Sequence, residues 1–186
     1  MKWKFFGLMS VGMLMVVMGM TSPAIAQDNM GMRSNKMMMS SMDQKLMTMA
    51  AMGGMAEVEM ARLALQKSGN DAVKQYAQKM IDDHMMAGDE LKQLASMKGV
   101  TLPMQQDAKQ MSMMAKMQKL SGMDFDRMYI KESGIKAHQN MVKLYMKESM
   151  SGRDMDAKAW ATKTLPTVQM HLQMARDIMK SMGRGM

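Results

Sequence analysis

Hydrophobic residues follow a helical period along most of the chain. The clearest stretch runs from residue 73 to residue 94, where the buried positions are separated by steps of three and four. The apolar residues at these positions are Val73, Ala77, Met80, Ala87, Leu91 and Leu94. Such spacing places side chains on one face of a helix and predicts that this face is buried. His84 is the polar residue that interrupts it.

The same period predicts five helices, separated by glycine and proline breaks. They cover residues 43–67, 71–97, 104–120, 124–150 and 154–182. Asp43 is the expected N-cap of the first helix, and Pro166 is expected to kink the last one. Alternating strand patterns are absent from the sequence. We therefore predict an all-α fold, a four-helix bundle with one short extra crossover helix.

Every histidine of the chain falls on the buried face of a long helix. His84 lies 14 residues after Asn70, and His138 lies 14 residues before Gly152. At 1.5 Å per residue, each is about 21 Å from the end of its helix, near mid-height of the bundle. His171 falls about 7 Å from that level by the same arithmetic. We therefore expect the three imidazoles to approach one another inside the bundle.

The first helix offers a carboxylate at the same height. Glu57 lies 13 residues before Asn70 and is in phase with the buried positions, whereas Glu59 lies toward the flank of the helix. The candidate metal ligands are His84, His138, His171, Glu57 and Glu59. Imidazole and carboxylate groups bind copper, zinc and iron, so a transition metal ion is the expected cofactor. The alternative is a buried network of hydrogen bonds among the same residues.

The sequence does not favour an enzyme. A ferritin-type di-iron centre needs a glutamate three residues before its histidines, but Ile81, Ile135 and Val168 occupy those positions. Motifs of a catalytic serine or of a glycine-rich phosphate loop are absent. The chain has no cysteine, which excludes thiolate metal sites and cysteine nucleophiles.

The first 26 residues have the features of an export signal. Lys2 and Lys4 precede an apolar run over residues 5–20, and Ala24 and Ala26 supply the small residues of a signal-peptidase site. This run is short for a membrane anchor. We expect cleavage after Ala26 and a periplasmic or envelope-associated protein.

The chain is thus expected to have three parts. They are a signal peptide (1–26), a disordered methionine-rich leader (27–42) and a helical bundle domain (43–183). The formal net charge of +8 falls to about +6 once Lys2 and Lys4 are removed. This charge is compatible with peripheral contact with an anionic envelope or membrane surface. Lys and Arg alternate with Asp and Glu along the helices, which favours an ordinary solvated surface over such contact. Only 4% of residues are aromatic and no basic stripe is present, which argues against a nucleic-acid partner. The sequence does not indicate an oligomeric state.

Methionine is strongly enriched. Of the 37 methionines, six precede residue 27. Met60, Met80, Met128 and Met174 stand where leucine would serve a core. Others lie in the polar leader or on several helix faces, and exposed thioethers are suited to Cu(I). Two alternatives to copper binding are an oxidant sink and compositional drift without functional gain.

Five segments resemble a bacterial family of exported domains of unknown function, often labelled a predicted outer membrane protein. The segments are AAMGGMAEVEMARLAL (50–65), VKQYAQKMIDDH (73–84), DELKQLASMKGVTLP (89–103), SGMDFDRMYIKESGIKAH (121–138) and KTLPTVQMHLQMA (163–175). The motif residues are Glu57, Glu59, Asp83, His84, Asp126, Tyr129, His138, Pro166 and His171. The resemblance covers roughly residues 43–180 and implies a ferritin-like helical bundle.

The residues and the resemblance together lead to one main expectation. It is an exported helical bundle that binds a transition metal, copper favoured, in envelope metal handling or stress response. The alternatives are a non-catalytic structural or interaction protein of the envelope, and a methionine oxidant sink.

Overall fold

The computed structural model describes residues 39–184, and every regular element in this range is a helix. The elements are α1 (Ser41–Lys67), α2 (Asp71–Lys98), α3 (Ala108–Gln118), α4 (Gly122–Tyr129), η1 (Ile130–Ala137), α5 (His138–Ser151) and α6 (Met155–Arg184). Because α4, η1 and α5 follow one another without a break, they form one long helix with a π-helical middle. The predicted all-α bundle with one short crossover helix is confirmed. The expected signal peptide and residues 27–38 of the expected leader lie outside the described residues.

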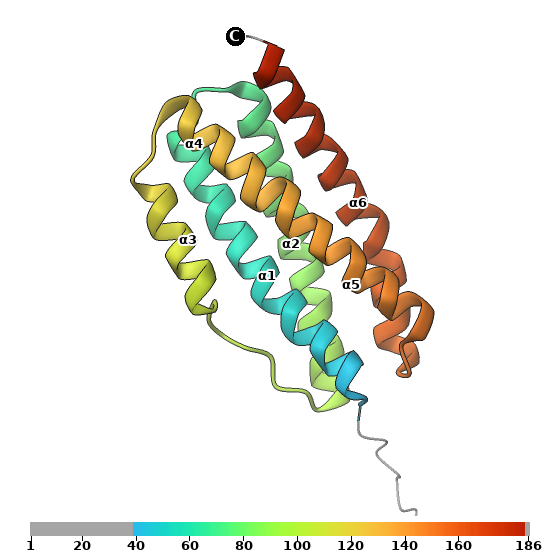
Figure 1. Ribbon diagram of the computed structural model, residues 1–186. Coiled ribbons are helices and arrows are strands. Elements are labelled where there is room, and N and C mark those ends of the chain that lie inside the picture. The colour runs from blue at the N-terminus through green and yellow to red at the C-terminus, as the bar shows by residue number, and fades with distance from the viewer. Residues whose placement is uncertain (1–38, 185–186) are drawn as a thin grey trace, which may run out of the picture. The chain divides into compact units, whose positions relative to one another are not determined.

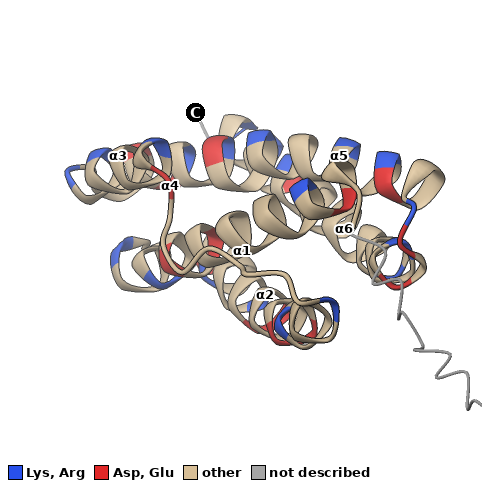
Figure 2. Ribbon diagram, turned by 90° about the horizontal axis from the view of Figure 1, so that it is seen from below, with Lys and Arg blue, Asp and Glu red and all other residues tan. Residues whose placement is uncertain are grey.

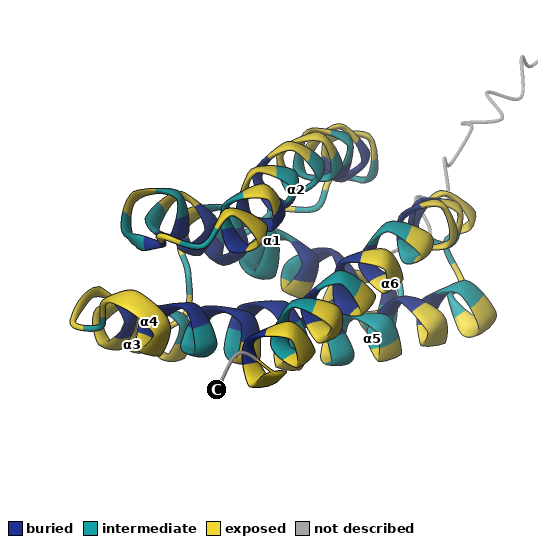
Figure 3. Cartoon of the chain, turned by 90° about the horizontal axis from the view of Figure 1, so that it is seen from above, coloured by how far each residue is buried: buried dark blue, intermediate teal, exposed yellow. Residues whose placement is uncertain are grey.

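The helices of the bundle form two layers. α1 packs along α2, and α5 packs along α6, which also contacts α2 and η1 (Figure 1). Seen from above, the buried faces of the two layers point toward each other (Figure 3). α3 lies beside α1 and α4, outside the four long helices. The core therefore lies between the two layers.

Helix ends differ from the expectation at two places. Ser40, not Asp43, is the N-cap of α1, and Asp43 completes a capping box in which each residue's side chain accepts the other's backbone N–H. The N-cap prediction was wrong because an acidic residue is equally favourable in the first turn, where it faces the positive end of the helix dipole. α3 begins only at Ala108, after its own capping residue Asp107.

The continuous α-helix expected over residues 124–150 is also interrupted. Residues Ile130–Ala137 adopt π-helical turns, which hold more residues per turn and rotate the side chains that follow. As a result, Ser133 and Gly134 are buried. A Cβ on Gly134 would lie 2.7 Å from the Cβ of Ala175, so a glycine is required for this close approach to α6. Pro166, in contrast, lies within an unbroken α6.

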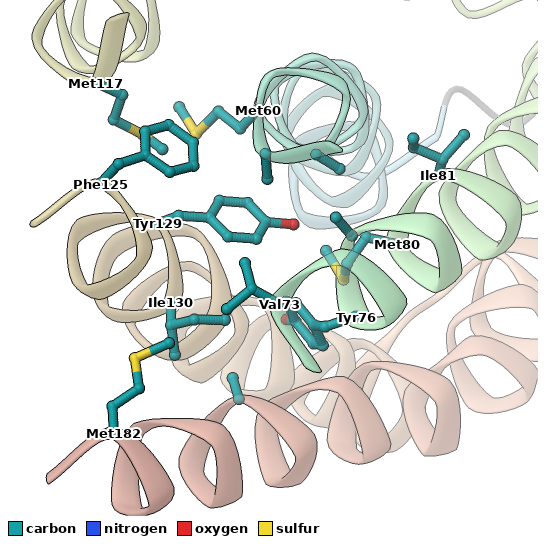
Figure 4. Packing of buried hydrophobic residues seen from close by; sticks show 14 residues of the cluster. Met60, Val73, Tyr76, Met80, Ile81, Met117, Phe125, Tyr129, Ile130 and Met182 are labelled. Carbon is teal, nitrogen blue, oxygen red and sulfur yellow. The ribbon is translucent and has the colours of Figure 1, made fainter. Parts of the chain in front are cut away.

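The core consists of two hydrophobic clusters stacked along the bundle axis. The first cluster surrounds the aromatic rings of Tyr76, Phe125 and Tyr129, and Met117 of α3 covers its side (Figure 4). The second cluster contains Leu46, Leu91, Tyr145, Trp160 and Val168 among others. Burial of these side chains is the main source of stability, since the chain has no disulfide.

The bundle surface carries charges of both signs. Lys and Arg are interspersed with Asp and Glu along the helices (Figure 2). Within residues 39–184, no helix combines the length and the hydrophobicity that crossing a membrane requires.

Candidate metal centre

Four polar residues lie at the boundary between the two hydrophobic clusters. Glu57, His84, His138 and His171 come from α1, α2, α5 and α6, and each lies along its helix between residues of the two clusters. On α1, for example, Ala50 belongs to one cluster and Met60 to the other. The boundary is therefore the mid-height level at which the sequence predicted a meeting of imidazoles.

The three histidine rings converge at this level. Each offers a ring nitrogen, and the three nitrogens lie within 4.8 Å of one another. Nε2 of His138 and Nδ1 of His171 are 3.3 Å apart. Glu57 is next to the group, with Oε2 3.2 Å from Nε2 of His84 and Oε1 3.4 Å from Nδ1 of His138. The sequence placed His171 about 7 Å along the bundle axis from the level of the other two histidines. In the structure its ring nevertheless reaches them.

His138 is held in one orientation by the π-helical segment. Its Nδ1 lies 2.9 Å from the carbonyl oxygen of Ser133, five residues earlier in η1. A carbonyl oxygen only accepts hydrogen bonds, so Nδ1 must carry the hydrogen. In the neutral ring, Nε2 then carries a lone pair.

His171 is oriented by a carboxylate. Its Nε2 lies 2.7 Å from Oδ2 of Asp83, which also pairs with Lys79 at 3.0 Å. Burial acts to raise the pKa of Asp83, but the hydrogen bonds from His171 and Lys79 outweigh it and lower the pKa. Asp83 is therefore an ionised acceptor, Nε2 of His171 carries the hydrogen, and Nδ1 of the neutral ring carries a lone pair.

Two lone pairs therefore face each other between His138 and His171. The two nitrogens, Nε2 of His138 and Nδ1 of His171, are 3.3 Å apart. A hydrogen bond between them would require one of the rings to be an imidazolium. Burial opposes this charge, since it lowers the pKa of His138 to about 4 and also lowers that of His171, although Asp83 partly offsets it there. At neutral pH, protein hydrogen bonding alone leaves this contact unfavourable.

Glu57 and His84 contact the cluster without well-formed hydrogen bonds. Among the described residues, Oε1 of Glu57 and Nε2 of His84 form no hydrogen bond of good geometry, and their polar neighbours are the ones at 3.4 Å and 3.2 Å given above. Glu57 is nevertheless buried, with only 4% of its surface exposed. Burial raises the pKa of Glu57 to about 8. It lowers the pKa of His84 well below its usual value, and the neighbouring His138 and His171 lower it further. Neutral imidazoles beside a carboxyl group with few partners form a set that a cation would stabilise.

The site is also lined by residues that the sequence analysis did not name as candidate ligands. A small cavity of about 10 Å³ lies at the cluster. Its walls include Glu57, His84, His138, Met141 and Tyr145. Met141 thus adds a thioether to the wall, where the helical period indicated only a buried apolar residue. Asp83 was recognisable as one of the motif residues of the family resemblance, directly before His84. The role of Ser133 had no sequence signal, because it depends on the π-helical turn.

Glu59 does not join the cluster. It is exposed on α1, and its carboxylate accepts a hydrogen bond from the side chain of Gln106. Two residues along an α-helix correspond to a rotation of about 200°, so Glu57 and Glu59 cannot both face the core. Of the five candidate ligands, the structure brings together Glu57 and the three histidines.

Solved structures with a similar fold come from three proteins. A DUF305 fragment from Deinococcus radiodurans matches with a TM-score of 0.66 at 13% identity, covering 78% of this chain and 98% of its own. A DUF305 protein from Streptomyces coelicolor, described as secreted, matches with a TM-score of 0.65 at 12% identity. The match covers 77% of this chain and 94% of that protein. CopM in the Cu(II)-bound form matches with a TM-score of 0.63 at 19% identity. The match covers 75% of this chain and 96% of CopM. At these identities the likeness shows the helical-bundle fold alone.

Sequence comparison identifies the family. None of the curated proteins compared matches the chain. A family model described as "Domain of unknown function (DUF4142)" matches residues 29–178, which is most of the chain. This match agrees with the resemblance of residues 43–180 to exported domains of unknown function. The chain therefore belongs to the DUF4142 family.

Proposed function

We propose that this protein is an exported, non-enzymatic bundle that holds a transition metal ion, copper favoured, in envelope metal handling or stress response. His84, His138 and His171 would each supply an imidazole nitrogen, and Glu57 a carboxylate oxygen. Export is supported by the signal-like residues 1–26 and by the description of a similarly folded protein as secreted.

The contact between His138 and His171 carries the proposal. Two ligand nitrogens of a tetrahedral ion with bonds of 2.0–2.1 Å lie roughly 3.4 Å apart. Nε2 of His138 and Nδ1 of His171, the two nitrogens that carry the lone pairs, are 3.3 Å apart. Asp83 and the Ser133 carbonyl hold the opposite ring nitrogens, which is the outer-shell arrangement that orients metal-bound histidines.

The donor set favours copper among the transition metals. Imidazole and carboxylate groups also suit zinc and iron, but a thioether selects softer ions. Met141 lies on the cavity wall beside His84 and His138. CopM, whose fold is similar, has been solved with Cu(II) bound. A hydrogen-bonded scaffold, the competing interpretation, leaves the facing lone pairs without a shared partner.

Metal titration of the purified mature chain tests the proposal. We expect about one tight equivalent of Cu(I) or Cu(II) in competition with a chelator, and a loss of affinity of at least 100-fold in His138→Ala. Glu59→Gln is the matched control, because it removes a charge from the same bundle level outside the cluster. Helicity and melting temperature of each variant identify any unfolding. Absence of tight metal from the wild type, or unchanged affinity in a folded His138→Ala, would overturn the proposal.

Exposed methionines favour a second candidate function, an oxidant sink. Met97, Met104, Met150 and Met155 are 68–92% exposed and lie outside the core clusters. Their oxidation to sulfoxide would cost little stability, unlike that of the buried Met60 or Met80. Peptide mass spectrometry after mild peroxide treatment should find these four oxidised first, with helicity retained. Early oxidation of core methionines together with unfolding would contradict a protective role.

A further inference from the structure

A large groove lies on the side of the bundle, between α1, α2 and the segment that leads into α3. Its volume is about 930 Å³. Ala50, Gly54, His84 and Tyr145 border both this groove and the small cavity at the metal centre. His84 is thus the candidate ligand at which groove and cavity meet, and the groove is an approach from the surface to the buried cluster.

Five methionines from four segments line the groove. They are Met55 of α1, Met85 of α2, Met104 of the connecting segment, and Met111 and Met114 of α3. Packing does not account for all of them, since Met104 is 92% exposed and Met85 and Met111 are about half exposed. A thioether is a weak ligand for most divalent ions but a good one for Cu(I). The lining is therefore chemically selective, which a leucine lining would not be.

Gly54 lies where the groove and the small cavity meet. A Cβ on Gly54 would lie 3.9 Å from Nδ1 of His84. A larger side chain at this position would therefore stand beside the imidazole and fill the space through which an ion approaches it. Gly88 borders the same groove, but a Cβ there would meet no other atom within 4 Å.

We propose that the methionine-lined groove is a second, weaker Cu(I) site and the route by which Cu(I) reaches the histidine cluster past Gly54. This inference rests on the proposed function, because it needs a tight metal site at the end of the route. Labile thioether contacts gather the ion, and transfer to His84 moves it to stronger imidazole ligands. No electron changes hands, since the ion remains Cu(I) and only exchanges ligands.

Uptake kinetics test the route. In one variant the five groove methionines are changed to leucine, a swap that nearly conserves volume and costs little stability. The matched control changes five exposed methionines outside the groove, which are Met97, Met146, Met150, Met155 and Met170. Cu(I) is delivered from a chromogenic chelator and uptake is followed by stopped flow, with Zn(II) as the ion that does not need thioethers.

We expect the groove variant to take up Cu(I) at least tenfold more slowly and to lose weak Cu(I) equivalents that the control variant keeps. Its tight equivalent and its Zn(II) uptake should match those of the wild type and of the control variant. Gly54→Leu should slow uptake of both ions, whereas Gly88→Leu should not. Unchanged Cu(I) uptake in the groove variant would overturn the route while the tight site stands. Absence of a tight equivalent in the wild type would instead overturn the proposed function and, with it, the route.

Discussion

The hydrogen positions on two histidines decide how the buried cluster is interpreted. Ser133 requires a hydrogen on Nδ1 of His138, and Asp83 requires one on Nε2 of His171. The remaining nitrogens of the two neutral rings can only accept, and they face each other. A shared cation resolves this contact, whereas an added proton is opposed by burial, which lowers the pKa of both rings. The metal interpretation therefore follows from hydrogen-bond chemistry and not from the presence of histidines alone.

Asp83 should tune metal affinity without touching the ion. Asp83→Asn keeps an acceptor for Nε2 of His171 but removes the negative charge that makes the imidazole a better ligand. We expect the metal affinity to fall roughly 10- to 100-fold, as is typical for such outer-shell partners. Asp82→Asn is the control, because Asp82 is exposed and accepts a hydrogen bond from Gln78, away from the histidines. Equal affinities of the two variants in a competition titration would show that Asp83 has no such role.

At the level of helices, much of the architecture could be predicted from the sequence. The period of the apolar residues located all four long helices and the buried face that carries His84, because burial of one helix face leaves a direct trace in the sequence. The π-helical turn of η1 left no such trace. Within it, Gly134 packs against Ala175 of α6, a contact between residues 41 positions apart that the local sequence does not reveal. The hydrogen bond from His138 to Ser133 was unpredictable for the same reason.

The close contact at Gly134 leads to a test of η1. In Gly134→Ala, the new methyl group would lie 2.7 Å from the Cβ of Ala175, so the helices must move apart. We expect the free energy of unfolding to fall by about 1–3 kcal/mol, despite the higher helix propensity of alanine. Gly88→Ala lies in a helix with free space and should stabilise by up to about 1 kcal/mol. Chemical denaturation measures both, and a stable Gly134→Ala protein would contradict the packing argument.

At the scale of the whole bundle, a buried carboxyl pair joins its two layers. Asp43 of α1 accepts hydrogen bonds from the backbone N–H groups of Arg153 and Asp154, in the turn between α5 and α6. Glu148 lies beside Asp43 and is fully buried, and neither of its oxygens has a donor among the described residues. Burial, the contact with Asp43 and the charge of Asp154 raise the pKa of Glu148 to about 7, although Lys158 partly offsets them. A proton on Glu148 therefore helps to hold the layers together.

This pair makes the stability of the bundle depend on pH. Because the pKa of Glu148 is raised in the folded state, its contribution is complete below about pH 4.5 and is lost as the pH rises through about 7. Glu57, whose pKa is raised to about 8, and the histidines of the unfolded chain also titrate between about pH 5 and pH 9. The informative quantity is therefore the difference in the free energy of unfolding between wild type and Glu148→Gln. Between about pH 5 and pH 9, the free energy of unfolding of the wild type should fall relative to that of Glu148→Gln by on the order of 1–3 kcal/mol. The variant is therefore favoured at high pH. Glu90→Gln, on the surface beside Lys163, should show no such trend.

The tautomers of the buried histidines test the central claim most directly. ¹⁵N NMR of the metal-free protein at about pH 7 should find His138 protonated on Nδ1 and His171 protonated on Nε2, both rings neutral. Titration with Cu(I) or Zn(II), which are diamagnetic, should then shift Nε2 of His138 and Nδ1 of His171 and leave the two N–H groups in place. A hydrogen found on either of the facing nitrogens, with no shift on adding metal, would contradict the account and leave a hydrogen-bonded scaffold in its place.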